Sequence, residues 1–319
     1  TPVRHCDPFS QCTSVEFDHW LLPCRTTDAL GNTARAENDF RVLQAKTMID
    51  PNGNCTELAF DPLGLVVATA VRGKEKDGAW EGDSLEDPTT RMEYELFAWK
   101  EHQRPNFVHT FSREQHGPDN PRWQEAFLYS DGFGRELQTK VQAEPGDAPQ
   151  RAAQDPATPY TPGVLVRDAD GEPVQEHTDS RWVGTGRIVY NNKGKPVKQY
   201  EPFFSSTHLY EDEPEMTDTG VTPVLFYDPL GRVIATLHPN HTFEKVVFDP
   251  WPQVTYDVND TVTFDPKKDA DVGGFLSRLP DDEYLPTWHQ LRTEPAYAGP
   301  FSLLRTTGLI RRNPINICF

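Results

Sequence analysis

The sequence has few methionines, no long apolar run and no apolar pattern at helical spacing. Its 319 residues include 3 Met, whereas 29 Pro and 21 Gly interrupt the chain throughout. We therefore expect few and short helices, with residues 282–292, interrupted by Pro286, as the best helical candidate. Because spanning a bilayer takes about 20 apolar residues, the sequence predicts no membrane insertion. A hydrophobic content of 36% and a mean hydropathy of -0.66 predict a sheet with much of its area in water.

Basic residues are also scarce, with 31 Lys and Arg against 49 Asp and Glu and a formal net charge of -18. Proteins bind nucleic acid through clustered Lys and Arg that displace counterions from phosphates, so we exclude nucleic acid as a partner. The acid is partly concentrated in EDEPEMTD, residues 211–218. We interpret this run as a solvated loop rather than a metal site.

Cysteine is limited to five residues, and these form neither a CxxC pair nor a zinc knuckle. We interpret them as free thiols, with an N-terminal disulfide as the alternative. The five are Cys6, Cys12, Cys24, Cys55 and Cys318. No signal peptide stands at the start. The chain opens on Thr1 rather than Met, as a fragment or processed product would. The absence of a signal peptide therefore excludes no compartment.

Catalytic motifs are missing from the sequence: it has no GxSxG, HExxH or GxGxxG pattern. The HPNH segment, His238 to His241, is better explained as a turn between strands than as two metal ligands. The acidic segments at Asp168 and Asp269 lack most of a calcium loop, and we interpret them as Asp-Gly turns. The sequence therefore predicts no enzymatic activity, no cofactor and no metal.

What the sequence does contain is a recurring turn followed by a strand, in residues 60–71, 129–141, 190–200 and 227–237. In each copy an aromatic residue precedes Asp, Asn or Ser, which hydrogen-bonds the local backbone, and a Gly follows where φ must be positive. β-Branched or alternating residues come next, as in a strand. The residues that we expect at these turns and strand ends are Phe60, Asp61, Gly64, Tyr129, Asp131, Gly134, Tyr190, Gly194, Tyr227, Asp228, Gly231, Phe248 and Asp249.

The spacing of the copies varies from roughly twenty to seventy residues, so the sequence is not a solenoid of fixed period. It predicts an all-β fold, a long antiparallel array of hairpins. One hairpin runs over residues 232–248, with HPNH at its tip. Isolated hairpins are marginally stable, so the array must join a larger sheet. We expect four aromatic residues to pack between successive repeats: Phe60, Tyr129, Tyr190 and Tyr227.

These repeats resemble YD, or Rhs, repeats. The longer strings YSDGFGRELQTKVQAEPG from Tyr129, RWVGTGRIVYNNKGKPVKQY from Arg181 and LFYDPLGRVIATLHPNHTFEKVVFDPWPQ from Leu225 are similar to the later, shell-forming part of the B component of bacterial Tc (toxin complex) insecticidal toxins. The resemblance implies that residues 1–290 form a segment of a β-cocoon wall, with a subdivision near residues 144–180. Residues 291–319 form a C-terminal tail without a match.

In that family, the B and C components form a hollow shell of β-strands around a toxic domain. The resemblance therefore implies a non-enzymatic wall segment, secreted or extracellular within a toxin complex and cytoplasmic before release. It implies two partners: the C component, and the A component, a translocation channel that docks on a propeller outside the matched region. The match includes neither the protease core nor the toxic domain, so it supplies no catalytic residue.

Two other interpretations stay open from the sequence. Rhs-like repeats also occur in cell-surface proteins, and the 7 Trp residues could serve as stacking platforms of an adhesion or carbohydrate-binding module, although Trp is as often a core residue. The chain could also be a degenerate fragment without function. Glycan binding would favour the first of these, and failure to unfold cooperatively would favour the second.

Overall fold

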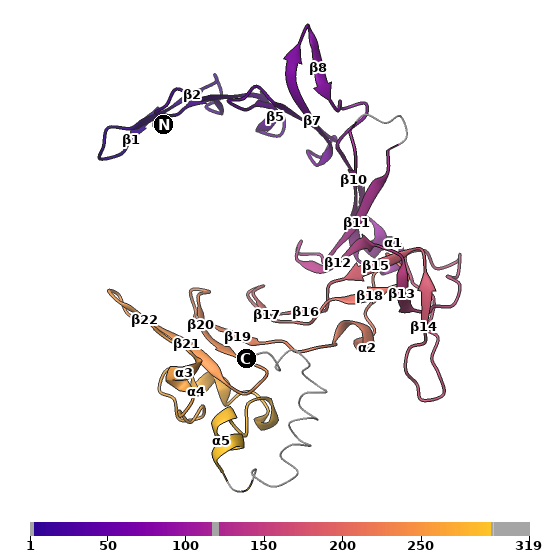
Figure 1. Cartoon of the computed structure of the whole chain (residues 1–319), viewed down its shortest axis with the longest axis vertical. Coiled ribbons are helices and arrows are strands. Elements are labelled where there is room, and N and C mark those ends of the chain that lie inside the picture. Colours follow the sequence, from indigo (N-terminus) through magenta and orange to yellow (C-terminus); the bar gives the residue numbers. More distant parts are fainter. Residues whose placement is uncertain (1–2, 117–120, 295, 297–319) are drawn as a thin grey trace. The chain divides into compact units, whose positions relative to one another are not determined.

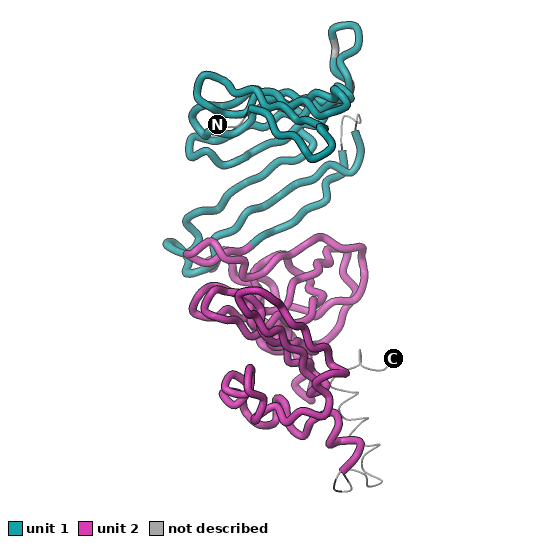
Figure 2. The backbone as a smooth tube through the Cα atoms, turned by 90° about the vertical axis from the view of Figure 1, so that its left-hand side faces the viewer, with its two compact units in different colours: residues 1–128 teal, residues 129–319 magenta. Residues whose placement is uncertain are grey.

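The computed structural model describes residues 3–116, 121–294 and 296. These are 42% strand and 9% helix, in mostly antiparallel sheets with five short helices, which confirms the predicted all-β fold. The chain divides into two compact units, residues 1–128 (unit 1) and 129–319 (unit 2) (Figure 2). The predicted boundaries at residues 144–180 and 290 stay predictions, and most of the predicted tail, residues 291–319, lies outside the described residues.

Unit 1 is a meander in which most sequential strands pair and are joined by short turns (Figure 1). The strand order is β1-β2-β3-β4-β5-β6-β7-β9-β10-β11, and β8 pairs with β7. The strands are β1 (Arg4–Cys6), β2 (Cys12–Phe17), β3 (Pro23–Thr27), β4 (Thr33–Asp39), β5 (Gln44–Ile49), β6 (Cys55–Phe60), β7 (Val66–Lys76), β8 (Ala79–Gly82), β9 (Thr90–Glu95), β10 (Asn106–Arg113) and β11 (Trp123–Ser130), with helix α1 (Ala98–His102) between β9 and β10.

Few side chains of unit 1 are fully buried, and most positions of its strands are half-buried. The buried apolar residues of its described part are Cys55, Ala68, Ala70, Ala98 and Phe127. Small residues predominate among them because little material covers the sheet. The wet sheet predicted from the low mean hydropathy is therefore present in this unit.

Unit 2 contains shorter sheets. The strand orders of three of them are β13-β14, β16-β17 and β19-β20-β21-β22, and β12, β15 and β18 of the 14-stranded sheet pair in that order. The strands are β12 (Glu136–Ala143), β13 (Gly146–Pro149), β14 (Gln175–Thr178), β15 (Arg181–Gly184), β16 (Ile188–Tyr190), β17 (Pro196–Gln199), β18 (Phe203–Ser205), β19 (Val224–Tyr227), β20 (Val233–Leu237), β21 (Phe243–Phe248) and β22 (Gln253–Tyr256). The helices are α2 (Pro214–Thr217), α3 (Val258–Thr261), α4 (Gly273–Leu276), the 3-10 helix η1 (Asp281–Glu283) and α5 (Trp288–Thr293).

The hairpin predicted over residues 232–248 is present as β20 and β21, with the HPNH segment in the turn between them. One face of this sheet is covered by the segment that carries α4 and η1 (Figure 1). The helical candidate over residues 282–292 becomes η1 and α5 on either side of Pro286. The core shared by the sheet and this segment comprises Val224, Ala235, Leu237, Phe243, Val272, Leu276 and Tyr284.

The cysteines differ from the free-thiol interpretation, because Cys6 and Cys12 form a disulfide. The two residues are cross-strand partners in the β1–β2 hairpin, so the register of the hairpin brings their side chains together. The alternative of an N-terminal disulfide is therefore the correct one for this pair. Cys24 and Cys55 are free thiols, and Cys318 lies outside the described residues.

Candidate functional site

The repeat turn has one geometry, which the turn at Asp228 illustrates. The backbone N–H of Asp228 donates to the carbonyl of Arg232 (3.0 Å), and the N–H of Gly231 donates back to the carbonyl of Asp228 (3.0 Å). The Asp228 Oδ1 accepts the N–H groups of Leu230 and Arg232, both at 2.9 Å. Gly231 closes the turn at a φ of +82°, where a side chain would be strained. The carboxylate thus replaces a backbone partner inside the turn.

The other predicted repeats share this arrangement. Asp61, Asp131 and Asn191 each accept backbone N–H groups on Oδ1, and Gly64, Gly134 and Gly194 each have a positive φ. The turn at Asp249 is shorter, since its N–H donates to Pro252 (3.0 Å). The Asp168 segment is the Asp-Gly turn expected from the sequence.

Sequence reasoning missed two turns of the same kind, at Asp7 and Asp18. In these turns Ser10 (φ 64°) and Leu21 (φ 63°) occupy the position that Gly takes elsewhere. The missing Gly hid them. The signal that remained was an Asp between two short alternating segments, because Asp18 Oδ1 still accepts two backbone N–H groups.

Hydrogen bonds within the turns lower the pKa of their carboxyl groups. The backbone N–H of Arg232, followed by its side chain, holds the pKa of Asp228 below its usual range. The side-chain amide of Asn32 does the same for the pKa of Asp28. Both carboxylates are therefore ionised at neutral pH and act as acceptors.

Three tyrosines connect the start of one turn to the strand that leaves an earlier turn. Each of their hydroxyls donates to a backbone carbonyl at 2.7 Å: Tyr94 to Val66, Tyr190 to Glu136, and Tyr227 to Pro196. In every case the acceptor is the second residue after the turn glycine, at position 64, 134 or 194. We call this contact the tyrosine lock.

Burial raises the pKa of all three tyrosine hydroxyls, so they remain protonated donors at neutral pH. Tyr190 and Tyr227 were predicted to pack between repeats. Tyr94 was missed because no Asp or Gly marks its repeat. The sequence feature that could have revealed this repeat is the acid that follows Tyr94. Glu95 Oε1 accepts the N–H of Phe97 (2.9 Å), as the Asp carboxylate does in the other turns.

The other predicted aromatic residues lie differently. Tyr129 is buried, and its hydroxyl donates to the carbonyl of His208 (3.0 Å). Phe60 is half-buried and has no hydroxyl to donate. Phe248 stands before the Asp249 turn, where the guanidinium of Arg232 lies 3.9 Å from its ring centroid. A cation–π contact at Phe248 therefore occupies the place of a tyrosine lock.

Neighbouring turns also contact each other directly. In unit 2, Lys193 Nζ donates to the carbonyl of Pro229 (2.7 Å), which links the turn at Asn191 to the turn at Asp228. In unit 1, Arg41 Nη1 donates to the carbonyl of Pro62 (3.0 Å), and the rings of Trp20 and Phe40 lie 6.4 Å apart. Each unit therefore contains its own stack of turns.

The acidic run at residues 211–218 is only in part the solvated loop that the sequence suggested: Asp212 and Glu215 are exposed, but the run begins on a buried acid. Glu211 is 1% exposed and Lys140 is fully buried, and the two form an ion pair. Arg151 contacts Glu211 as well, and its Nη1 lies 2.9 Å from Glu213 Oε1. Glu211 is buried because two basic residues from distant segments neutralise it, which the local composition does not reveal, whereas the two exposed acids of the same run remain in solvent.

Polar and aromatic neighbours complete this buried cluster. Gln138 Nε2 donates to the carbonyl of Glu211 (3.0 Å), and its Oε1 accepts the N–H of Glu211 (3.0 Å). The Lys140 ammonium lies 4.5 Å from the ring centroid of Phe203. Burial lowers the pKa of Lys140, while Glu211 opposes this shift. The cluster fixes the segment that begins at Glu211 against β12.

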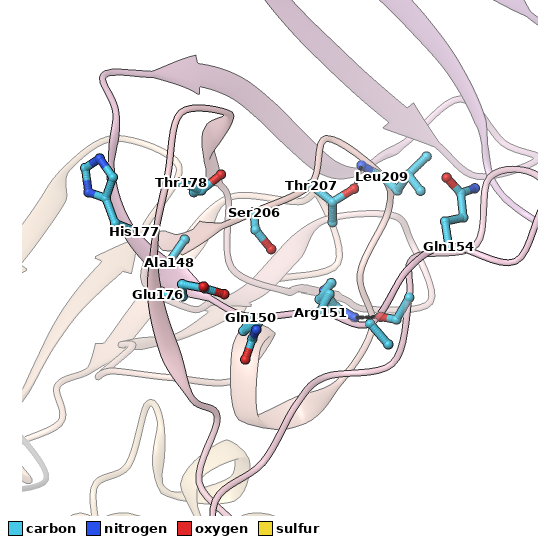
Figure 3. A pocket seen from close by; sticks show the side chains of 12 residues that line it. Ala148, Gln150, Arg151, Gln154, Glu176, His177, Thr178, Ser206, Thr207 and Leu209 are labelled. Carbon is cyan, nitrogen blue, oxygen red and sulfur yellow. Dashed lines mark hydrogen bonds between the residues drawn. The ribbon is translucent and has the colours of Figure 1, made fainter.

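A pocket of about 440 Å³ lies beside this cluster and includes Arg151 in its wall (Figure 3). The guanidinium of Arg151 is already occupied by its two carboxylates and by the carbonyl of Gly163 (2.6 Å). Ser206 donates its hydroxyl to the carbonyl of Pro149 (2.7 Å), so its proton is not directed at a base. The pocket therefore shows no arrangement of nucleophile, base and orienting group.

The remaining candidate ligand groups have structural partners. His241 Nδ1 lies 2.8 Å from the carbonyl of Pro286, and His238 and His241 sit in the predicted turn. Asp269 and Asp271 both contact Lys245 Nζ, at 2.8 and 2.7 Å. Within the described residues, no group of three or more His, Cys, Asp or Glu could hold a metal ion. None of the helices described is long and apolar enough to cross a membrane.

No family model and no curated protein matches the sequence. Solved structures of toxin complexes do match. The crystal structure of TcdB2-TccC3 is 26% identical with a TM-score of 0.55, covering 78% of this chain and 12% of that chain. The match to the crystal structure of TcdB2-TccC3-Cdc42 has 22% identity and a TM-score of 0.55, and it covers 80% of this chain and 15% of that chain. The match to the structure of the Photorhabdus luminescens Tc holotoxin pore has 22% identity and a TM-score of 0.55, and it covers 81% of this chain and 15% of that chain.

The fold is therefore related to that of a segment of these Tc toxin structures. The chain spans 12–15% of the length of the toxin chains that it matches.

Proposed function

We propose that this chain is a non-enzymatic wall segment of a Tc-type toxin shell that encloses a toxic cargo for delivery through a translocation channel. One observation carries the proposal: the tyrosine lock recurs with the same acceptor position at Val66, Glu136 and Pro196. A device that joins one repeat to an earlier one extends a sheet sideways, as a wall requires. The fold shared with TcdB2-TccC3 supports the same assignment.

The exposed surface of unit 1 agrees with a wall that works in an assembly. Its half-buried sheet carries large apolar side chains in the solvent, including Trp20 (64% exposed), Leu63 (72%) and Leu30 (85%). All three side chains lie in turns between strands, where a partner in an assembly could cover them. The partners that we propose are a C component, as shell partner and source of the cargo, and an A component, as channel. The complex acts outside the producing cell.

The test is assembly with a C component. The purified chain, joined to the rest of a B component, is mixed with TccC3 and analysed by size-exclusion chromatography. We expect a co-migrating complex in which the cargo domain resists added protease. The double variant Tyr190→Phe/Tyr227→Phe removes two tyrosine locks and keeps both rings, so the complex should form with weaker protection. The chain alone should hydrolyse neither glycosides nor peptides.

Other outcomes contradict the proposal. Binding on a glycan array, without any complex with TccC3, would favour the adhesion module. Unfolding without a cooperative transition would favour the degenerate fragment. Turnover of a glycoside that disappears when one acidic residue is replaced would refute the non-enzymatic assignment.

A further inference from the structure

Lys245 lies in the four-stranded sheet of unit 2 and is almost fully buried. It belongs to β21, where its cross-strand partners are Ala235 on β20 and Tyr256 on β22. Only 6% of the residue is exposed. Its ammonium lies 4.9 Å from the ring centroid of Tyr256 and 5.6 Å from that of Phe264. An ammonium in such surroundings is costly to bury unless it is paired.

Two carboxylates of the segment that leads into α4 contact this ammonium. Lys245 Nζ lies 2.8 Å from Asp269 Oδ2 and 2.7 Å from Asp271 Oδ2. The side chain of Asp269 is 4% exposed, whereas that of Asp271 is 42% exposed. Lys140, the other buried lysine of the described chain, pairs with the single carboxylate of Glu211. Lys245 therefore has one buried carboxylate beside it and a second that reaches water.

The other oxygen of Asp269 is held by backbone donors. Asp269 Oδ1 accepts the N–H groups of Asp271 (3.0 Å) and Val272 (3.1 Å). Val272 is 1% exposed and belongs to the core beneath the sheet. Two N–H groups directed at one carboxyl oxygen stabilise the negative charge that develops when a nucleophile adds to the carboxyl carbon. One oxygen of Asp269 thus faces an amine nitrogen, and the other faces oxyanion donors.

We infer that Lys245 and Asp269 condense into an intramolecular isopeptide bond, with Asp271 as the group that transfers the protons. The new bond joins Lys245 Nζ to Asp269 Cγ. It ties β21 covalently to the segment that carries α4, across 24 residues of sequence, and so restricts the unfolded chain (Figure 1). The inference does not depend on the proposed function, because only side chains of this chain take part.

The reaction starts from charged groups. Burial lowers the pKa of Lys245, but hydrogen bonds with Asp269 and Asp271 outweigh burial and raise this pKa overall. The first step is therefore transfer of one proton from Lys245 Nζ, through the carboxylate of Asp271, to Asp269 Oδ2. The neutral amine then attacks Asp269 Cγ. A C–N bond forms, and the negative charge moves to Oδ1, where the two N–H groups stabilise it.

Asp271 also completes the proton balance. Its carboxylate takes a second proton from the nitrogen and delivers it to Asp269 Oδ2. The Cγ–Oδ2 bond breaks as the charge on Oδ1 returns to the carbonyl, and Oδ2 leaves as water with both protons. The products are one amide and one water molecule, and Asp271 is again a carboxylate. The condensation needs no oxidant, reductant or cofactor.

Mass spectrometry of the intact chain, with its disulfide reduced, tests the inference. The folded parent should be lighter than its sequence requires by the mass of one water molecule. Lys245→Arg should have its full calculated mass, because the guanidinium can still pair with both carboxylates but is not a nucleophile. A parent chain at its full calculated mass would overturn the inference, and this result does not depend on how any variant folds.

A matched pair of variants tests the role of Asp271. Asp271→Asn keeps the shape of the side chain but cannot accept the proton, so most of this chain should retain the water. Asp281→Asn is the control, because it removes an exposed ion pair, that of Lys267 and Asp281, whose side chains are 42% and 68% exposed. This variant should lose water as the parent does. Equal loss of water in both variants would contradict proton transfer by Asp271.

Digestion with trypsin locates the bond. An amide at Nζ prevents cleavage after Lys245, so the digest of the parent should contain a branched peptide that joins residues 233–267 to residues 269–278. Fragmentation of this peptide should place the link between Lys245 and Asp269. Loss of water combined with normal cleavage after Lys245 would indicate a cyclic imide at an aspartate and would overturn the inference.

Discussion

The hydroxyl of Tyr227 donates to the carbonyl of Pro196 at 2.7 Å, across 31 residues of sequence. This bond joins the turn at Asp228 to the strand that leaves the turn at Asn191. The same relation holds between Tyr190 and Glu136, and in unit 1 between Tyr94 and Val66. It explains why an aromatic residue precedes the turn acid: the ring fills the gap between strands and the hydroxyl satisfies a carbonyl of the neighbouring repeat.

The first prediction removes one lock. Tyr227→Phe should lower the free energy of unfolding by about 1 kcal/mol, because it leaves the Pro196 carbonyl without its donor while the ring still packs. Urea denaturation followed by fluorescence measures the change. Tyr200→Phe is the control, since the hydroxyl of Tyr200 makes no hydrogen bond to the described chain. Equal losses in the two variants would contradict the lock.

The second prediction separates backbone strain from crowding at two turn glycines. Gly31 and Gly64 have φ values of +86° and +88°, but a Cβ on Gly31 would meet nothing within 4 Å, whereas one on Gly64 would lie 2.9 Å from Val42 Cγ1. Gly31→Ala should cost about 1 kcal/mol from strain. Gly64→Ala should cost about 2–4 kcal/mol, since crowding adds to the strain. Thermal denaturation measures both losses. A higher melting temperature for Gly64→Ala than for Gly31→Ala would refute the prediction.

The third prediction concerns the buried ion cluster. Lys140→Met should destabilise the chain by about 3–5 kcal/mol, because it leaves the Glu211 carboxylate buried beside Arg151 alone. Lys46→Met is the control: Lys46 pairs with Glu37 at 2.6 Å, but the two side chains are 44% and 67% exposed. That surface pair should be worth about 0–1 kcal/mol. Similar denaturation midpoints for the two variants would show that Lys140 does not hold the segment at Glu211.

The fourth prediction is a loss of stability in acid through the turn carboxylates. Hydrogen bonds in the folded state hold the pKa of Asp28 and Asp228 below the ordinary value of 3.8. A carboxyl group whose pKa is lowered in the folded state stabilises the fold at pH values above its ordinary pKa. This contribution is lost as the pH falls through the folded-state pKa. The free energy of unfolding should therefore fall below pH 3.8.

Replacing both carboxyl groups should reduce that fall. In the double variant Asp28→Asn/Asp228→Asn the amide oxygens can still accept N–H groups, as Asn191 Oδ1 does at 2.9 and 3.0 Å. The pH dependence below 3.8 should become shallower, as measured by urea denaturation over a pH series. Asp170→Asn is the control, because that exposed carboxylate accepts no hydrogen bond within the described chain. A slope unchanged from the parent would refute the assignment.

Much of the fold and of the turn positions could be predicted from the sequence because the repeat turn is a local structure. Asp228, Gly231 and Arg232 make all the hydrogen bonds of their turn within five consecutive residues. The failures have physical causes as well. At Leu21 the left-handed conformation is imposed on a residue that seldom adopts it, so no residue type marked that turn.

The sequence by itself determined the turns that carry an Asp or Asn and a Gly, the strands that follow them and that helices are few, because these depend on residues a few positions apart. The tertiary structure decided the rest. The lock acceptor of Tyr190 lies 54 residues away at Glu136, and the Glu211 carboxylate is neutralised by Lys140 at a separation of 71 residues. Such pairs form only when a specific register brings distant segments together. Composition near Glu211 predicts solvent, and its burial follows from the positive charges that the fold places beside it.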